Sequence, residues 1–155
     1  MGAANLDIAA PPPRSGSCVV FEILEHTADI GFRVWGKSQQ ALFENAALAL
    51  ESLAVELDDV QPAFLYALVA SGEDEESLLV NWLSEVLFHL DGRQVVMRQF
   101  QVDQLTSREV IGRGWGEPRD PVRHPSKLVV KGVTYHQLKM ARTPEGWCAE
   151  VYLDI

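Results

Sequence analysis

Apolar and polar residues alternate along several short segments of the chain, which is the period expected of β-strands with one buried face. In residues 29–35, Ile30, Phe32 and Val34 form one such apolar series. A second series runs through residues 147–155, and it follows the sequence Thr-Pro-Glu-Gly at 143–146, which is typical of a type I turn. We therefore expect a hairpin between the last two strands. The predicted strands are Cys18–Glu25, Asp29–Trp35, Phe64–Ala70, Val95–Val102, Val110–Gly114, Lys127–Met140 and Trp147–Ile155.

Two longer segments repeat their apolar residues every three to four positions, as amphipathic helices do. The first helix is predicted over Ser38–Leu57, where the Ser38 hydroxyl can accept a free N–H of the first turn. The second is predicted over Asp74–Leu90, after acidic residues that favour the positive end of a helix dipole. The order of the elements, with hairpins at both ends, predicts an α+β fold. In this fold two amphipathic helices pack on one face of a mainly antiparallel sheet.

The length of 155 residues suits one domain with a substantial core. We expect this domain to span residues 18–155. Residues 1–17 contain the run Ala-Ala-Pro-Pro-Pro, and proline suits neither a helix interior nor a sheet, so this lead is predicted to be disordered. Residues 115–125 contain three prolines and predict a loop.

Acidic residues outnumber basic residues by 22 to 13, which gives a net charge of −9. This balance argues against tight binding to RNA by phosphate neutralisation, and it suits a cationic protein partner or a bound metal. Charged residues interrupt the apolar stretches well before the ~20 residues that a membrane span needs, so we expect no membrane segment. Cys18 and Cys148 are far apart and form neither a disulfide framework nor a zinc motif, which makes a reducing cytoplasm the expected location.

The last predicted strand brings two carboxylates side by side, the Asp154 side chain and the α-carboxylate of Ile155. Paired oxygen ligands suit Mg²⁺, Mn²⁺ or Ca²⁺, although a solvated Asp154 is the simpler interpretation of this strand taken alone. Lys131 points either to water or to an anionic group, and His136 fits a hydrogen-bonded sheet residue better than a ligand. No serine elbow and no glycine-rich phosphate loop is evident.

Six motifs, in this order, resemble the archease family over residues ~20–155. Each motif alone is a weak signal, but the complete series is specific. The motifs are His-Thr-Ala-Asp-Ile-Gly at 26–31, Phe-Glu-Asn-Ala-Ala at 43–47, the helical segment Leu78–Leu87, Trp-Gly-Glu-Pro at 115–118, Lys-Gly-Val-Thr-Tyr-His at 131–136, and Val-Tyr-Leu-Asp-Ile at 151–155.

The resemblance implies a non-catalytic protein cofactor of the RNA ligase RtcB, which acts in tRNA splicing and RNA repair. Such a cofactor promotes guanylylation and multiple turnover of the ligase, and it broadens the ligase's use of nucleotides beyond GTP. By the same resemblance Asp29, Asp154 and the Ile155 carboxylate form a divalent metal site, seen with calcium in the family, while the physiological metal stays open. Lys131 matches a lysine important for activation, while His26 and His136 match motif positions whose roles the resemblance does not define, which makes them candidates for a supporting role.

Two other classes of function stay open at this stage. A small divalent-metal-dependent hydrolase would use Asp29, Asp154 and a histidine, but it also needs a base and a substrate pocket that the sequence does not identify. A general chaperone-like interaction module is favoured only if no dependence on a ligase is found. Because Asp29 begins one predicted strand and Asp154 ends another, we expect both to lie at the same end of the sheet.

Overall fold

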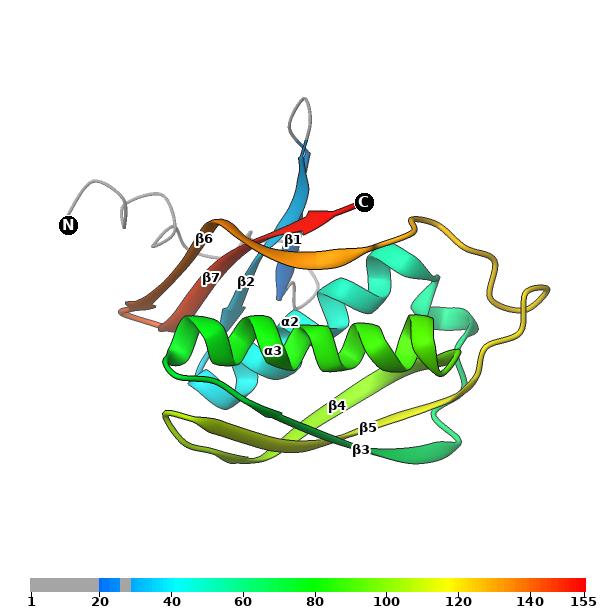
Figure 1. The fold of residues 1–155 in the computed structure, drawn as a ribbon, viewed down its shortest axis with the longest axis horizontal. Coiled ribbons are helices and arrows are strands. Elements are labelled where there is room, and N and C mark those ends of the chain that lie inside the picture. Colours follow the sequence, from blue (N-terminus) through cyan, green and yellow to red (C-terminus); the bar gives the residue numbers. More distant parts are fainter. Residues whose placement is uncertain (1–19, 26–28) are drawn as a thin grey trace.

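Seven strands and two α-helices make up the part of the chain that the computed structural model describes, residues 20–25 and 29–155 (Figure 1). A 3₁₀ turn, η1, follows the first helix, and a π-helical turn, η2, follows the second. The elements are β1 (Phe21–Glu25), β2 (Ile30–Gly36), α2 (Gln39–Ala54), η1 (Leu57–Asp59), β3 (Phe64–Ser71), α3 (Glu75–Leu87), η2 (Phe88–Gly92), β4 (Val95–Leu105), β5 (Glu109–Pro118), β6 (Gly132–Thr143) and β7 (Gly146–Asp154).

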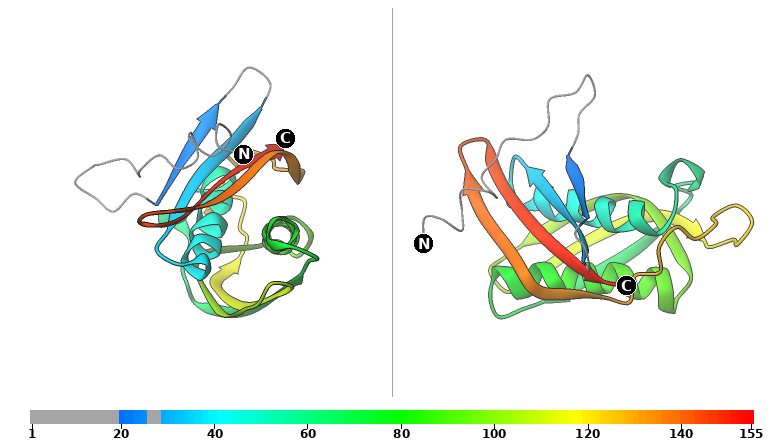
Figure 2. Two further views of the ribbon diagram at one scale, coloured as in Figure 1. Left: turned by 90° about the vertical axis from the view of Figure 1, so that its left-hand side faces the viewer. Right: turned by 90° about the horizontal axis from the view of Figure 1, so that it is seen from above.

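The strands form two antiparallel sheets with the order β1-β2-β7-β6 and β3-β5-β4. Both helices lie between the two sheets, so each sheet carries helices on one face (Figures 1 and 2). Helix α2 packs against β2 and β4, and α3 packs against β3 and β6. The α+β class is confirmed, while the expected single sheet is replaced by two. Alternation identifies the buried face of each strand, but it does not specify which strands pair.

The core is formed where the helices meet the inner faces of the two sheets. Leu42, Phe43 and Leu83 are fully buried, and Leu87 is nearly so, as the helical periodicity predicts. The Trp82 ring lies near Phe43, and its indole N–H donates to the Phe43 carbonyl oxygen at 2.9 Å, so this large buried aromatic leaves no polar group unpaired. The apolar faces of both helices therefore form the core together with the inner faces of the two sheets.

Both helices begin as the sequence indicates. The Ser38 hydroxyl accepts a hydrogen bond from the Ala41 N–H at 3.1 Å. Asp74 accepts from the Ser77 N–H at 2.7 Å, and the Ser77 hydroxyl accepts from the Asp74 N–H at 3.1 Å, which completes a capping box. The first helix ends at Ala54 rather than at the predicted Leu57, because Val55 adopts an extended conformation and Leu57 belongs to η1.

Strand β5 is longer than the sequence predicts. The strand continues to Pro118, so residues 115–118 belong to a sheet and not to a loop. Alternating glycines lie on its inner face. A Cβ at Gly112 would collide with the Trp82 ring, and one at Gly114 would collide with Met97. These glycines make room for large core side chains. Strand β5 therefore has glycines where a strand usually has apolar residues on its buried face.

Strand β6 begins at Gly132 and not at Lys127. The main-chain N–H groups of Lys127 and Leu128 instead donate to carbonyl oxygens at the end of α2. Strand β3 matches its prediction to within one residue, and Thr143 pairs with Gly146 in the expected hairpin. In the described part of the chain, neither helix combines the length and the apolar character required to cross a bilayer. The predicted lead over residues 1–17, the start of the first strand and the turn His26-Thr27-Ala28 lie outside the described residues.

Candidate functional site at one end of the four-stranded sheet

Asp29 and Asp154 lie where β2 and β7 pair at the end of the four-stranded sheet. The antiparallel register sets Ile30 opposite Leu153, and the same register continued by one residue sets Asp29 opposite Asp154. Directly opposite residues of antiparallel strands have Cβ atoms roughly 5 Å apart. Asp29 is half-buried and Asp154 is exposed, and neither carboxylate accepts a hydrogen bond from another described residue. The register thus supports the predicted proximity of the two carboxylates.

Lys131 lies at the same end of the sheet because β6 begins beside the end of β7. The Lys131 main-chain N–H donates to the Asp154 carbonyl oxygen at 2.7 Å, and the next residue, Gly132, pairs with Asp154. The Lys131 side chain is exposed, as is the Ile155 side chain. We call Asp29, Lys131, Asp154 and Ile155 together the strand end; in Figure 1 it lies beside the label C.

A buried polar network lies next to the strand end on the same face of the sheet. Arg33 donates to Glu150 Oε2 from Nε at 3.1 Å and from Nη2 at 2.9 Å. Tyr152 donates its hydroxyl to Glu150 Oε1 at 3.1 Å. Burial alone would lower the pKa of Arg33, but the hydrogen bonds and charge of Glu150 raise it above its ordinary value. The network therefore keeps Glu150 paired with a permanently charged guanidinium.

Tyr152 connects this network to Asp29. Burial, followed by the charge of Glu150 and its hydrogen bond, raises the pKa of the Tyr152 hydroxyl, and the charge of Asp29 contributes in the same direction. Tyr152 pairs with Gly31 on β2, where an added Cβ would collide with the Tyr152 ring and with the Val151 carbonyl oxygen. Glycine at position 31 thus lets the tyrosine ring lie against β2, one residue from Asp29.

His136 lies on an irregular part of β6 rather than at the strand end. The register between β6 and β7 shifts between Thr134 and Lys139, so residues 135–138 bulge out of the regular pairing. The His136 N–H donates to the Thr134 hydroxyl at 3.0 Å, its side chain is exposed, and Gln137 has a φ of 56°. The sequence predicts a hydrogen-bonded histidine within a sheet. The main chain of His136 forms such a hydrogen bond, but its side chain is exposed. His26, the other supporting residue, lies outside the described residues.

The structure contains a second polar cluster, which the sequence analysis missed. Glu117 is buried and accepts hydrogen bonds from both terminal nitrogens of Arg123, at 2.9 and 2.8 Å, and from the Gln61 N–H at 2.8 Å. His124 Nδ1 accepts from the Asp120 N–H at 2.9 Å, so Nε2 carries the proton that bonds Glu117 Oε2 at 2.9 Å. Pairing with Arg123 and the other donors lowers the pKa of Glu117 to about 2. The only sequence signal was the Trp-Gly-Glu-Pro motif itself.

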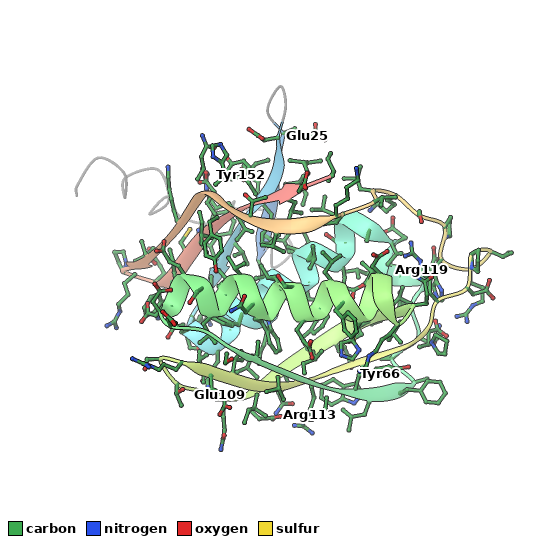
Figure 3. The ribbon with its side chains drawn as sticks, in the orientation of Figure 1. Glu25, Tyr66, Glu109, Arg113, Arg119 and Tyr152 are labelled. Atoms are coloured by element: carbon green, nitrogen blue, oxygen red, sulfur yellow. The ribbon has the colours of Figure 1, made fainter. Side chains whose placement is uncertain are left out.

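Trp115, in the same motif, lies on the outer face of the other sheet. It pairs with Leu65 of β3, it is half-buried, and the Arg113 guanidinium lies 5.2 Å from its ring centroid. Arg113 and Tyr152 lie on opposite sheets (Figure 3). Trp115 is therefore not part of the strand end.

A family model described as the Archease protein family (MTH1598/TM1083) matches residues 21–155. The chain belongs to the archease family. It is 40% identical to the protein archease of Methanopyrus kandleri over 138 residues, which are 87% of this chain and 99% of that protein. It is 38% identical to the protein archease of Methanosarcina mazei over 139 residues, which cover 87% of this chain and 95% of that protein.

The fold of this archease family member agrees with a solved structure. The solution structure of Methanobacterium thermoautotrophicum protein 1598 aligns with a TM-score of 0.72 and 30% sequence identity. The alignment covers 87% of this chain and 98% of that protein. The strand end and the Glu117 cluster both lie within the residues that the archease family model matches.

The donor atoms at the strand end fit a hard divalent cation better than a soft one. Carboxylate oxygens are the ligands that Ca²⁺, Mg²⁺ and Mn²⁺ prefer, whereas Cys148 is buried and the thiol's pKa is raised to about 12, mainly by burial. Among the described residues, no group of three or more Asp, Glu, His or Cys side chains is arranged to hold a metal ion. The strand end therefore contains two side-chain carboxylates, those of Asp29 and Asp154.

Proposed function

We propose that this chain is a non-catalytic activator of an RtcB-type RNA ligase, and that the strand end is the part that acts on the ligase. In this proposal it promotes guanylylation and multiple turnover of the ligase and broadens its use of nucleotides. The observation that supports the proposal is the convergence of Asp29, Lys131 and Asp154 at one end of one sheet, although they are far apart in sequence. These are the residues that the resemblance to archeases associates with activation.

The electrostatics of the strand end support a role in binding a cation. Two adjacent carboxylates repel each other unless a cation or a cationic partner neutralises them. In the proposal Asp29, Asp154 and the α-carboxylate of Ile155 hold the divalent metal, which supplies the neutralising positive charge. Lys131 keeps its charged amine in water beside them, where it is available to an acidic or phosphate group of the ligase.

The test is single-turnover guanylylation of the ligase with and without substoichiometric amounts of this protein. We expect Asp29→Asn and Lys131→Met each to lower activation about tenfold or more, since a tenfold loss corresponds to about 1.4 kcal/mol. Residues added after Ile155 should also lower activation, because they convert a carboxylate into a neutral peptide carbonyl. The matched control is Glu145→Gln, an exposed carboxylate in the hairpin at the other end of β7.

The outcomes separate the proposal from its alternatives. Normal activation by folded Asp29→Asn and Lys131→Met proteins would remove the strand end from the mechanism. Failure of the unmodified protein to activate the ligase, together with metal-dependent hydrolysis of a phosphoester by the protein alone, would favour the hydrolase. Tight binding of RNA by the isolated protein would contradict the expectation from its net charge of −9.

A further inference from the structure

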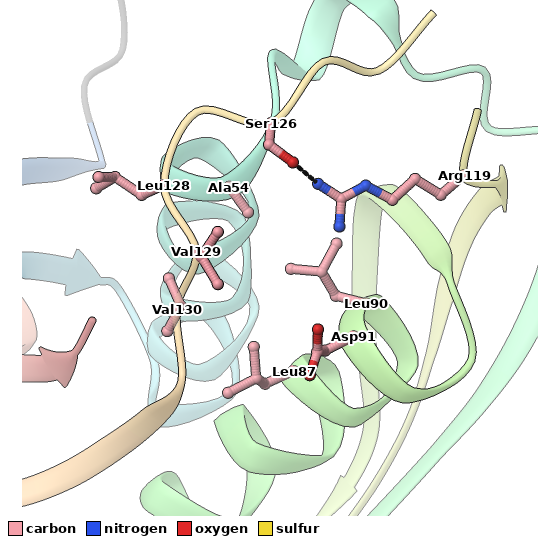
Figure 4. Close-up of a pocket in the computed structure, with 9 residues that line it drawn as sticks. All are labelled: Ala54, Leu87, Leu90, Asp91, Arg119, Ser126, Leu128, Val129 and Val130. Carbon is pink, nitrogen blue, oxygen red and sulfur yellow. Dashed lines mark hydrogen bonds between the residues drawn. The ribbon is translucent and has the colours of Figure 1, made fainter. Parts of the chain in front are cut away.

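A small cavity lies beneath the segment that leads to Lys131. It has a volume of about 170 Å³ and lies between the last residues of the two helices and residues 126–130 (Figure 4). Ala54 lines it from α2, while Leu87 and Leu90 line it from α3 and η2. Residues 128–130, which are Leu-Val-Val, form the opposite wall. Six of the nine residues that line the cavity are apolar, and the other three, Asp91, Arg119 and Ser126, are polar.

One cation lies at the rim of this cavity. Arg119 Nη2 donates to the Ser126 hydroxyl at 2.7 Å, as Figure 4 shows. The main-chain N–H of Arg119 donates to the Gln94 carbonyl oxygen at 2.8 Å, which fixes the position from which the side chain extends. No carboxylate among the described residues forms an ion pair with Arg119, although Asp91 also lines the cavity. The guanidinium thus has N–H groups left for an anion.

The volume of the cavity restricts its occupant. Pockets for nucleotides and drug-sized ligands measure roughly 300–1,000 Å³. A cavity of about 170 Å³ is too small for them, and its leucine and valine walls leave room for one aliphatic or aromatic side chain beside the polar residues Asp91, Arg119 and Ser126. Pockets that receive one such anchor side chain are typical of the energetic centres of protein interfaces.

The cavity and the strand end are linked by one short segment. The N–H groups of Lys127 and Leu128 donate to the carbonyl oxygens of Ala54 and Leu53. These carbonyls belong to the last turn of α2, where a helix offers them no N–H partner of its own. Three residues later the Lys131 N–H donates to Asp154. Val129, between these two attachments, lines the cavity and is 65% exposed. A partner that contacts Lys131 and Asp154 therefore reaches the cavity without leaving this segment.

We propose that the cavity receives one apolar side chain of the partner protein, next to an acidic partner residue that pairs with Arg119. The proposal rests on the proposed function, since the partner is the ligase that binds the strand end. The charges support it: the strand end offers carboxylates to cationic groups, and Arg119, which donates to Ser126 at the other end of this segment, offers a cation. The cavity thus supplies affinity, while the strand end supplies activation.

The test compares variants that fill the cavity or remove its cation with matched variants elsewhere. Ala54→Leu places a larger side chain in the cavity, and Ala67→Leu makes the same change on an exposed position of β3. Arg119→Gln removes the cation, and Arg108→Gln removes an exposed arginine in the turn before β5. The readouts are the dissociation constant for the ligase by calorimetry and the protein concentration that gives half-maximal guanylylation.

We expect Ala54→Leu and Arg119→Gln to raise both quantities about tenfold or more, while activation at saturating protein stays near the unmodified level. The two matched variants should change neither quantity. If Ala54→Leu does not fold, as judged by circular dichroism, Val129→Asp takes its place, because position 129 is exposed and tolerates a polar side chain.

Ligase binding by both cavity variants with unchanged affinity would overturn the proposal while the proposed function stands. Absence of ligase binding by the unmodified protein would instead overturn the proposed function. Two other outcomes also contradict the cavity proposal. If the protein self-associates and Ala54→Leu abolishes this, the cavity binds a second copy of the chain. If a free nucleotide raises the melting temperature of the protein and Ala54→Leu abolishes this, the cavity binds the nucleotide.

Discussion

The Glu117 cluster and the strand end both contain carboxylates, but their surroundings are opposite. Glu117 is buried and receives hydrogen bonds from Arg123, His124 and the main chain of Gln61. Asp154 is exposed, and no described residue donates a hydrogen bond to its carboxylate. The two carboxylates therefore differ in how many of their acceptor positions are already used. Those of Glu117 are occupied by donors from the protein, whereas those of Asp154 are accessible to a cation or a partner.

Glu51 provides a third environment, and it sharpens this comparison. Its side chain on α2 is fully buried, and neither carboxyl oxygen has a well-formed hydrogen bond to a described residue. Burial raises its pKa to about 8, and the nearby Met97 main chain and the charge of Arg119 oppose this only in part. Glu51 is thus a buried acid whose raised pKa favours the protonated form, Glu117 is a buried and paired carboxylate, and Asp154 is an exposed one.

The largest effect on stability is expected from Glu51. Because its pKa is raised in the folded state, its contribution is fully present below the ordinary value of 4.5 and is lost as the pH rises through about 8. One pKa unit corresponds to about 1.4 kcal/mol, so the free energy of unfolding should fall by about that amount per pH unit in this window. The free energy of unfolding of Glu51→Gln, measured with urea from pH 5 to pH 8, should fall less with pH than that of the unmodified protein. An equal slope for the two proteins would mean that Glu51 is not buried as a neutral acid.

The Glu117 cluster should contribute less, and with the opposite dependence on pH. Glu117→Ala leaves the buried His124 N–H without an acceptor, so we expect a loss of about 2 kcal/mol in the free energy of unfolding. Since the pKa of Glu117 is lowered to about 2, its stabilisation is present above pH 4.5 and is lost as the pH falls toward 2. Thermal unfolding at pH 3 and pH 6 checks the sign. A variant that is destabilised equally at both pH values would contradict it.

A smaller effect is expected from the network beside the strand end. Tyr152→Phe removes the hydroxyl that donates to Glu150 and keeps the ring over Gly31. We expect a loss of about 1 kcal/mol in the free energy of unfolding. Activation of the ligase should be reduced less than by Asp154→Asn, because the carboxylates themselves are retained. An activation defect as large as that of Asp154→Asn in a stable Tyr152→Phe protein would place the tyrosine hydroxyl at the site itself.

Periodicity predicted most of the elements, because each strand and helix has one clearly apolar face. It ended β5 too early, at Gly114 instead of Pro118, because the glycines on the inner face of this strand leave space for Trp82 and Met97 of other elements. A residue whose role is to leave space carries no hydrophobic signal of its own. The assignment of strands to two sheets was also beyond the pattern, since α2 buries residues toward both sheets.

The two carboxylate clusters also differ in how far the sequence could predict them. The strand end could be predicted because antiparallel pairing brings the start of one strand to the end of its neighbour, which places Asp29 near Asp154. The Glu117 cluster could not, because its donors come from positions 61, 123 and 124, and no local pattern links them. Sequence reasoning therefore finds sites created by regular pairing more readily than sites created by irregular segments.

The most direct test of the account measures stability and ligase activation on the same two proteins, Asp154→Asn and Glu117→Ala. Asp154→Asn should keep its free energy of unfolding to within about 0.5 kcal/mol, as expected for an exposed position, and should lose most of the activation of single-turnover guanylylation. Glu117→Ala should lose stability and, at a temperature where it is folded, activate the ligase at the unmodified level. The reverse pattern, with Asp154→Asn activating normally and folded Glu117→Ala inactive, would contradict the assignment of the strand end as the acting site.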